Sequence, residues 1–226
     1  MAEALGLALP GSALMPATSP DLLAYAKEAG KRAAWMAGEE DMRPSKIVTM
    51  DSFENAIYVH AAISGSTNCM LHLPAIAHEF GIEITGDTFD RIHRGARYLL
   101  DVRPAGRWPA ECFYYAGGVP AIMEEIKEHL HLDVMTVTGK TLGENLEELK
   151  ANGFYEKCDK WLQEFNQRYQ VNVTKEDIIR PYDKAIGTDG SIAVLKGNLA
   201  PEGAVIKHTA CPKEMFKSVL RARPFD

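Results

Sequence analysis

The sequence lacks most of the short motifs by which catalytic and metal-binding sites are recognised. No two of its four cysteines are spaced as CxxC or CxxxC, so spacing gives no support for a zinc site or an iron–sulfur cluster held by this chain alone. There is no HExxH motif, no GxSxG nucleophile turn and no GxGxxG loop. Gly139-Lys140-Thr141 resembles the end of a phosphate loop, but Val134 stands where that loop needs its first glycine. These absences argue against nucleotide binding, serine hydrolysis and a metalloprotease site.

Histidines are present but are not arranged as metal ligands. His72 and His78 are separated by six positions, and His129 and His131 by two, so neither pair shares a helix face. The sequence therefore predicts no histidine metal site in this chain.

The chain is also short of positive charge and of long apolar runs. Its 25 Lys and Arg residues against 31 Asp and Glu residues give a net charge of -6, which argues against nucleic acid as the main partner. No apolar run approaches the roughly 20 residues of a membrane-spanning helix. The N-terminal segment has no basic stretch of the kind that begins a signal peptide. With cysteines best interpreted as reduced thiols, the sequence predicts a globular cytoplasmic protein without a membrane or nucleic-acid partner.

The order of helical and β-branched segments indicates an α/β fold. A helix is expected from 22 to 36, after the start signal Ser19-Pro20-Asp21, and short strands are expected at 98–102 and 133–137. Helices joined to strands by short glycine turns indicate layering around a mostly parallel sheet. Residues 191–208 instead alternate as two strands of a separate β structure. Residues 1–9 have the pattern of the last turns of a helix whose start is missing.

The stretch from Ala62 to Gly81 organises the chain. A turn of small residues, 64–68, leads into an apolar helix, and Ser66 or Thr67 is predicted to be its N-cap. Such a turn leaves backbone N–H groups directed outward, which suits a carboxylate or phosphate ligand. The alternative is an ordinary capped helix of the core.

Three further polar turns extend this candidate site. Gly117-Gly118, Gly139-Lys140-Thr141 and Lys196-Gly197-Asn198 each follow or join predicted strands, and ligands of parallel α/β sheets bind beyond the strand ends. Hydroxyl, amide and lysine side chains would suit a polyhydroxylated acid. The alternative is that these are tight structural turns.

Several segments together resemble the dihydroxy-acid and sugar-acid dehydratase family, which includes phosphogluconate dehydratase. They fall in the family's order and cover nearly the whole chain. The segments are AEALGLALPGS (2–12), SFENAIYVHAAISGSTNCMLHLPAIAHEFGI (52–82), AGGVPAIM (116–123), TVTGKTLGENL (136–146) and AVLKGNLAPEGAVIKH (193–208).

The resemblance implies a hydro-lyase that eliminates water from a 2,3-dihydroxy acid to give a 2-oxo acid. It implies an iron–sulfur cluster and magnesium in the intact enzyme, although the family's CDK-type ligand motif and its TDGRFSG-type base motif are absent from this sequence. The chain therefore resembles a central fragment that binds neither cofactor and holds no catalytic residue. The substrate-proximal candidates are Ser66, Thr67 and Asn68, followed by Lys196 and Asn198.

The implied architecture has two parts. Residues 1–183 would be the C-terminal part of an α/β domain with a mostly parallel three-layer sandwich, and residues 184–226 would begin a β-barrel-like domain. The implied partner is a small dihydroxy or sugar acid, and the intact protein is expected to be a homo-oligomer. Two other interpretations stay open: a non-catalytic fragment of a broken gene, and a sugar-acid-binding α/β module without turnover.

Overall fold

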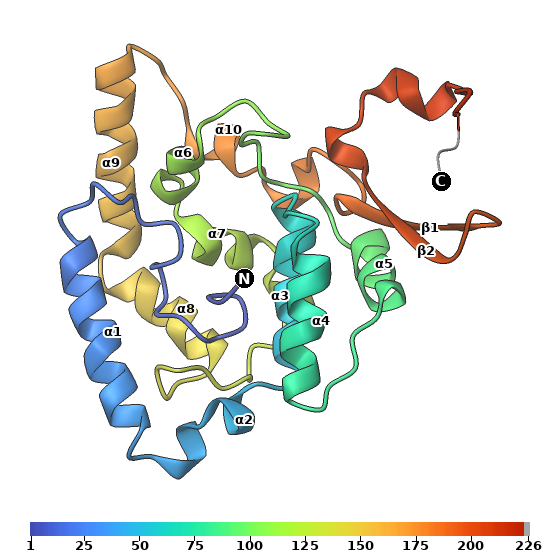
Figure 1. The fold of residues 1–226 in the computed structure, drawn as a ribbon. Coiled ribbons are helices and arrows are strands. Elements are labelled where there is room, and N and C mark those ends of the chain that lie inside the picture. Colours follow the sequence, from blue (N-terminus) through green and yellow to red (C-terminus); the bar gives the residue numbers. More distant parts are fainter. Residues whose placement is uncertain (224–226) are drawn as a thin grey trace.

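A computed structural model describes residues 1–223 of the chain as a helical body carrying a β-hairpin on one side (Figure 1). The helices are α1 (Leu22–Met36), α2 (Pro44–Ile47), α3 (Met50–Ala62), α4 (Cys69–Glu79), α5 (Gly86–Gly95), α6 (Ala110–Tyr115), α7 (Gly118–Glu125), α8 (Leu142–Ala151), α9 (Phe154–Tyr169) and α10 (Lys175–Ile178). Short 3-10 helices are η1 (Glu40–Met42), η2 (Lys127–His129), η3 (Tyr182–Lys184), η4 (His208–Ala210) and η5 (Lys213–Lys217). The strands are β1 (Ile192–Gly197) and β2 (Ala200–Lys207).

Helix α3 lies at the centre of the core. Phe53, Ala56 and Ile57 are fully buried, since apolar residues at this spacing line one face of the helix. On the opposite face Asp51 is exposed, and Glu54 and Tyr58 are partly buried. Other fully buried large side chains come from neighbouring elements: Phe89, Leu73, Leu99, Ile122, Met123, Ile126, Leu146 and Ile178. The residues of the 52–82 segment thus provide the packing centre of the molecule.

Helix α3 is capped by Thr49 and not by the acidic residues at its start. Asp51 and Glu54 have the spacing of a capping box, but the cap is Thr49, whose Oγ1 accepts from the Ser52 N–H at 3.4 Å while Ser52 Oγ accepts from the Thr49 N–H at 3.2 Å. The carboxylates of Asp51 and Glu54 are consequently free for other contacts.

The two strands expected in the body form only isolated bridges. Tyr98 pairs with Gly187, Leu100 with Ile179, and Met135 with Thr141. Tyr98, Leu99 and Leu100 are buried, as their apolar character requires, but the backbone of the segment bonds to separate elements rather than to a neighbouring strand, as in the bond from Leu99 N–H to Ala62 O at the end of α3, at 2.9 Å. The following turn folds back so that Trp108 N–H bonds to Asp101 O at 3.2 Å, which prevents a longer ladder. Residues 1–223 are therefore mixed α/β without a parallel sheet.

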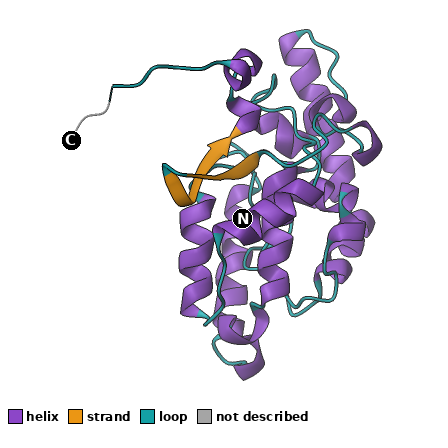
Figure 2. Ribbon diagram, turned by 90° about the vertical axis from the view of Figure 1, so that its right-hand side faces the viewer, coloured by secondary structure: helices purple, strands orange, loops and turns teal. Residues whose placement is uncertain are grey.

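The hairpin expected in 191–208 is confirmed. β1 and β2 are antiparallel, with Ile192 opposite Lys207 and Val194 opposite Val205. Two strands alone are marginal in water, and this pair packs on α5, where Val194 N–H bonds to Asp90 Oδ1 at 3.0 Å. Its tip leaves Leu199 95% exposed. Beyond η5 the chain leaves the body as an extended arm (Figure 2).

The first residues form a single helical turn that ends at Gly6. Gly6 has φ 76°, its N–H bonds to Glu3 O at 3.0 Å, and Leu7 N–H bonds to Ala2 O at 2.8 Å, which is the bonding of a glycine-terminated helix end. The Glu3 carboxylate is buried and accepts from the N–H groups of Gly11 at 2.6 Å and Ala13 at 3.0 Å. Burial raises the pKa of Glu3 to about 7, although these two hydrogen bonds oppose the rise.

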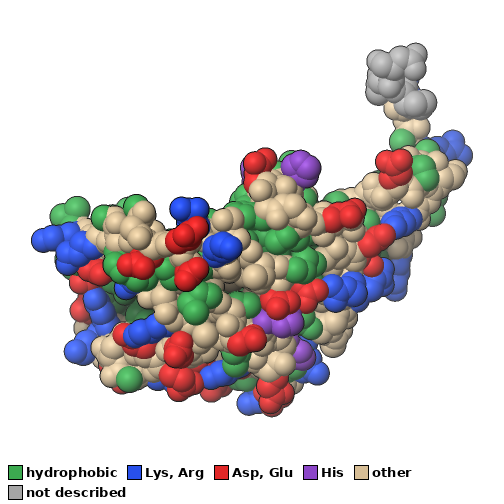
Figure 3. All heavy atoms as spheres, turned by 90° about the horizontal axis from the view of Figure 1, so that it is seen from below, with side chains coloured by type: hydrophobic (Ala, Val, Ile, Leu, Met, Phe, Trp, Pro, Cys, Tyr) green, Lys and Arg blue, Asp and Glu red, His purple; other side chains and the backbone are tan. Residues whose placement is uncertain are grey.

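The surface of the molecule carries side chains of both charges. Acidic and basic side chains are interspersed on the face seen in Figure 3.

Helix α1, packed over the body, buries none of its residues. A cleft of about 350 Å³ separates it from α8, with Tyr25 and Glu28 on one wall and Asn145 and Glu148 on the other. No helix within residues 1–223 is both long and apolar enough to cross a membrane.

Candidate functional site

The turn between α3 and α4 is built from residues that few others could replace. Ser64 has φ 54°, and Gly65 lies so close to the His60 ring that a Cβ there would come within 2.1 Å of its Cδ2. The N–H of Gly65 bonds to His60 O at 2.9 Å. Glycine at position 65 therefore follows from the close approach of the turn to a buried imidazole.

The candidates Ser66, Thr67 and Asn68 are exposed on this turn, but neither Ser66 nor Thr67 is the N-cap of α4. Asn68 occupies the cap position with helical dihedral angles and no side-chain cap bond, while Ser66 Oγ accepts from the Asn68 N–H at 3.3 Å. The N–H groups of Cys69 and Met70 bond within the turn to Ser66 O and Thr67 O. These amides are thus not directed at a ligand. The Thr67 hydroxyl and the side-chain amide of Asn68 have no hydrogen-bond partner within residues 1–223.

Two buried histidines lie beneath the turn. His60 of α3 and His93 of α5 are joined by a hydrogen bond of 3.1 Å between His60 Nδ1 and His93 Nε2. His60 Nε2 lies 2.9 Å from Ser66 O, and His93 Nδ1 accepts from the Ile192 N–H at 3.1 Å. Burial lowers the pKa of His60 to about 4 and that of His93 to about 3, so both are neutral near pH 7.

The hairpin approaches the same turn through its open end. Lys207 Nζ donates to Ser64 O at 2.6 Å, and the hydroxyls of Ser64 and Thr209 lie 2.8 Å apart. Gly190 N–H bonds to His93 O at 2.6 Å. A Cβ at Gly190 would come within 2.7 Å of His93 Nδ1, so only glycine allows this approach. The turn, the two histidines and the start and end of the hairpin thus form one polar junction.

Lys196 and Asn198 lie at the far end of the hairpin. The Lys196 ammonium pairs with Asp87 at 2.6 Å on the exposed surface, and Asn198 is exposed in the connecting turn. At about 3.3 Å per residue, the seven positions from Ala200 to Lys207 separate the hairpin tip from the junction by about 23 Å. The structure therefore brings Ser66, Thr67 and Asn68 together but does not bring the hairpin tip to them.

The other two polar turns have structural roles. Thr141 caps α8, since its Oγ1 accepts from the Glu144 N–H at 3.2 Å and Glu144 Oε2 accepts from the Thr141 N–H at 2.8 Å. Lys140 pairs with Glu148 at 2.7 Å. Gly117 precedes α7 with φ 105°, against Tyr155. The alternative of tight turns is confirmed for both.

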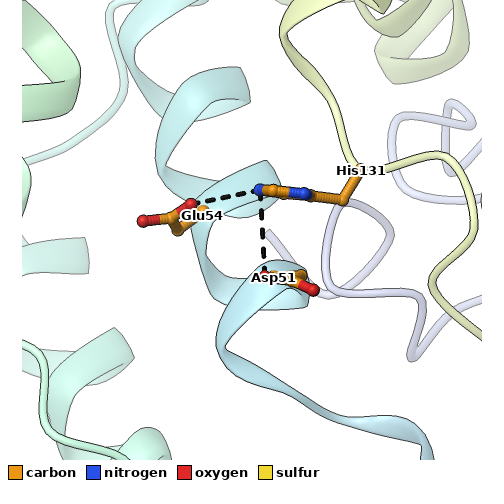
Figure 4. Close-up of side chains that lie close together, drawn as sticks. All are labelled: Asp51, Glu54 and His131. Atoms are coloured by element: carbon orange, nitrogen blue, oxygen red, sulfur yellow. Dashed lines mark hydrogen bonds and ion pairs between the residues drawn. The ribbon is translucent and has the colours of Figure 1, made fainter.

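One cluster of possible metal ligands was missed by sequence reasoning. Asp51, Glu54 and His131 bring one ligand atom each within 4.8 Å of one another, and Figure 4 shows His131 directed at the two carboxylates. His131 Nε2 lies 3.1 Å from Glu54 Oε2 and 3.9 Å from Asp51 Oδ1. His131 is held by its backbone, which exchanges two hydrogen bonds with the Asn55 side chain. No spacing rule could have found this set, because His131 is far from α3 in the sequence.

Part of the negative charge of this cluster is already neutralised. Arg91 donates to Glu54 Oε1 at 2.6 Å. Although partial burial opposes it, the hydrogen bonds from Arg91 and His131 hold the pKa of Glu54 below its usual value. A carboxylate pair with one imidazole has the donor atoms of a divalent transition-metal site, whereas magnesium prefers an all-oxygen set. The cluster is thus a poor fit to magnesium.

The cysteines do not fit an iron–sulfur cluster. Burial raises the pKa of Cys112 to about 12 and that of Cys158 to about 11, so neither has the setting of a reactive thiolate. All four cysteines are unpaired, and within residues 1–223 no three of them, alone or with other ligand residues, gather as a metal site.

Comparison with known proteins assigns the family. The sequence model described as dihydroxy-acid/6-phosphogluconate dehydratase N-terminal matches residues 1–145, and the corresponding C-terminal model matches residues 177–226. The chain belongs to the dihydroxy-acid/6-phosphogluconate dehydratase family. The junction of turn, histidines and hairpin therefore joins a segment matched by the family's N-terminal model to one matched by its C-terminal model.

Curated dehydratases are similar over the whole chain. The dihydroxy-acid dehydratase of Caldicellulosiruptor bescii is 40% identical over 228 residues, and dihydroxy-acid dehydratase 1 of Methanosarcina acetivorans is 42% identical over 226 residues, each match covering 100% of this chain. The dihydroxy-acid dehydratase of Sulfurisphaera tokodaii is 43% identical over 223 residues, or 98% of this chain. The chain spans about 37% of the length of the first two relatives and 36% of the third.

Proposed function

We propose that this chain is part of a hydro-lyase that eliminates water from a 2,3-dihydroxy acid to give a 2-oxo acid. The observation that carries the proposal is the match of both dehydratase models, in order, to a chain that is 40% or more identical to curated dihydroxy-acid dehydratases along its full length. The reaction takes a proton from C2 and a hydroxide from C3, and the resulting enol becomes the 2-oxo acid. Branched-chain dihydroxy acids, pentonates, hexonates and phosphogluconate are the substrate classes to test.

The residues of this chain would contribute to binding the substrate rather than to the proton transfer. The Thr67 hydroxyl and the side-chain amide of Asn68 are exposed and unpartnered within the described chain, and each can both donate and accept hydrogen bonds. A dihydroxy acid presents hydroxyl groups and a carboxylate that need such partners. Ser66 is proposed beside them, with Lys196 and Asn198 as the second group because Lys196 is already paired with Asp87.

The cofactors are proposed to be held elsewhere in the complete enzyme. In the complete enzyme an iron–sulfur cluster would supply Lewis acidity for the departing hydroxyl and magnesium would neutralise the substrate carboxylate, but the cysteines and the Asp51–Glu54–His131 cluster of this chain do not fit these two groups.

The architecture of the complete enzyme is proposed on the same basis. Residues 1–183 would be the C-terminal part of an α/β domain with a mostly parallel three-layer sandwich. Residues 184–226 would begin a β-barrel-like domain. The enzyme is proposed to be a cytoplasmic homo-oligomer.

A chimeric enzyme tests the proposal. The chain would replace the matching segment of Methanosarcina acetivorans dihydroxy-acid dehydratase 1, with which it aligns over 226 residues; we refer to this protein as the chimera. It would be purified without oxygen and assayed for 2-oxo acid formation from the four substrate classes, with the unmodified relative as control. Turnover of at least one class is expected. A folded chimera, loaded with cluster like its parent, that binds a sugar acid but turns over none would contradict the proposal.

A further inference from the structure

The hydrogen bonds of the polar junction fix the protonation of both buried histidines. The Ile192 N–H can only donate, so His93 Nδ1 must be unprotonated and His93 Nε2 carries the hydrogen. His93 Nε2 then donates to His60 Nδ1, which leaves the hydrogen of His60 on Nε2, where it donates to the Ser66 carbonyl. Since a carbonyl can only accept, both ends of the chain of bonds require the same assignment. Two neutral imidazoles thus connect the start of β1 to the turn.

The packing around the rings leaves them no other position. His60 is fully buried and His93 is 1% exposed. Gly65 lies against the His60 ring and Gly190 against the His93 ring, each closer than a Cβ would allow. The Phe89 ring meets His60 edge-on with centroids 6.2 Å apart. The two rings therefore cannot rotate to exchange donor and acceptor atoms without moving the backbone on both sides.

The charges near the pair favour its neutral state. Besides burial, Lys207 lowers the pKa of His60, and His208 lowers that of His93, while Asp90 opposes the shift of His93. A protonated imidazole has no acceptor atom, so a proton on either ring would break one bond of the connection. Neutral rings are thus a condition for the connection between β1 and the turn.

The Ser66 carbonyl is the point on which the connection acts. It accepts from His60 Nε2 at 2.9 Å and also from the Cys69 N–H at 3.1 Å, the first residue of α4. Its position therefore sets both the direction of Thr67 and Asn68 and the start of the helix behind them.

We propose that His60 and His93 are positioning residues for the Ser66–Asn68 turn, coupling its geometry to docking of the hairpin through a fixed chain of hydrogen bonds. An effect of the turn on the dehydration rate rests on the proposed function, whereas the hydrogen-bonded geometry of the histidines and the turn does not. A merely structural pair would fill space equally well with any side chain of similar size. A positioning pair requires a donor at His60 Nε2.

Nuclear magnetic resonance of the ring nitrogens in this chain tests the assignment directly. Both histidines are expected to be neutral, with hydrogen on Nε2 and none on Nδ1, at pH 7. Hydrogen on Nδ1 of either ring, or a charged ring at that pH, would overturn the proposal.

Variants of His60 test the positioning role. His60→Gln places an amide N–H near the position of Nε2 and keeps the donor for Ser66 O, although it removes the acceptor for His93 Nε2, whereas His60→Asn is too short to keep either. Loss of one such hydrogen bond is expected to lower kcat/KM of the chimera roughly three- to tenfold, so His60→Asn should show at least that loss and His60→Gln should recover part of it. His72→Gln, at an exposed position on α4, is the control and should leave kcat/KM unchanged. Equal losses in both His60 variants, measured below their melting temperatures, would refute a positioning role.

A second readout separates this proposal from the proposed function. In the isolated chain, the backbone amide resonances of Thr67 and Asn68 should shift in His60→Asn and stay in place in His60→Gln. If the unmodified chimera were inactive, the proposed function would fail and these resonances would still decide the positioning role. Unmoved resonances in both variants would overturn it.

Discussion

Removing the Glu3 carboxyl should remove a definite part of the pH dependence of stability. The pKa of Glu3 is raised from 4.5 to about 7 in the folded chain, mainly by burial. Between these two values the folded chain binds a proton that the unfolded chain has released, so the contribution of Glu3 to stability is present below pH 4.5 and is lost as the pH rises through 7. With 1.36 kcal/mol per pKa unit, the loss between pH 5 and pH 8 is about 2.5 kcal/mol.

Urea denaturation of the chain and of Glu3→Gln across that pH range measures this loss. The glutamine cannot ionise, so the difference in free energy of unfolding between the two proteins should change by about 2.5 kcal/mol from pH 5 to pH 8, in favour of the variant at high pH. The histidine pair contributes equally to both proteins and cancels. Glu39→Gln, at an exposed position, is the matched control and should run parallel to the unmodified chain.

Parallel curves for Glu3→Gln and the unmodified chain would refute the reasoning. They would mean that the N–H groups of Gly11 and Ala13 stabilise the carboxylate enough to cancel its burial.

Three further outcomes are expected. Phe53→Ala removes a fully buried ring and should lower the free energy of unfolding by about 3–5 kcal/mol in urea titrations. Phe216→Ala, at a ring that is 57% exposed, should change the free energy of unfolding by less than about 0.5 kcal/mol. Similar losses at both sites would contradict the assigned core. Lys196→Met breaks only an exposed ion pair and should change the melting temperature little, so a large loss of stability would show that the hairpin depends on it. Anaerobic reconstitution of the chain with iron and sulfide should give no stoichiometric cluster by absorption and iron content, and a cluster would show that its cysteines are ligands.

Much of the helical framework could be predicted because its signals are local. Ser19-Pro20-Asp21 correctly placed the start of α1. The alternation in 191–208 correctly gave the hairpin. The segments 98–102 and 133–137 were wrong as strands, because an apolar run reports burial and not the partner with which its backbone pairs.

The candidate site was predictable only in part, for a related reason. The small residues of 64–68 marked an unusual turn, but their cause is the ring of His60 against Gly65, a contact that composition does not show. The bond between His60 and His93 joins residues of two helices, and no helical spacing relates them. Lys196 was grouped with the turn because both are polar, whereas the antiparallel register places it toward the tip of the hairpin.

The most direct test of the account is the effect of Asn68 on the dehydration rate of the chimera. Asn68→Ala should lower kcat/KM for 2-oxo acid formation about tenfold, as expected for a lost hydrogen bond to a charged substrate group, without changing the melting temperature. Asn172→Ala, also exposed but in the loop before α10, is the matched control and should keep the full rate. If Asn68→Ala matched the unmodified chimera in both rate and KM, the Ser66–Asn68 turn would not contact the substrate.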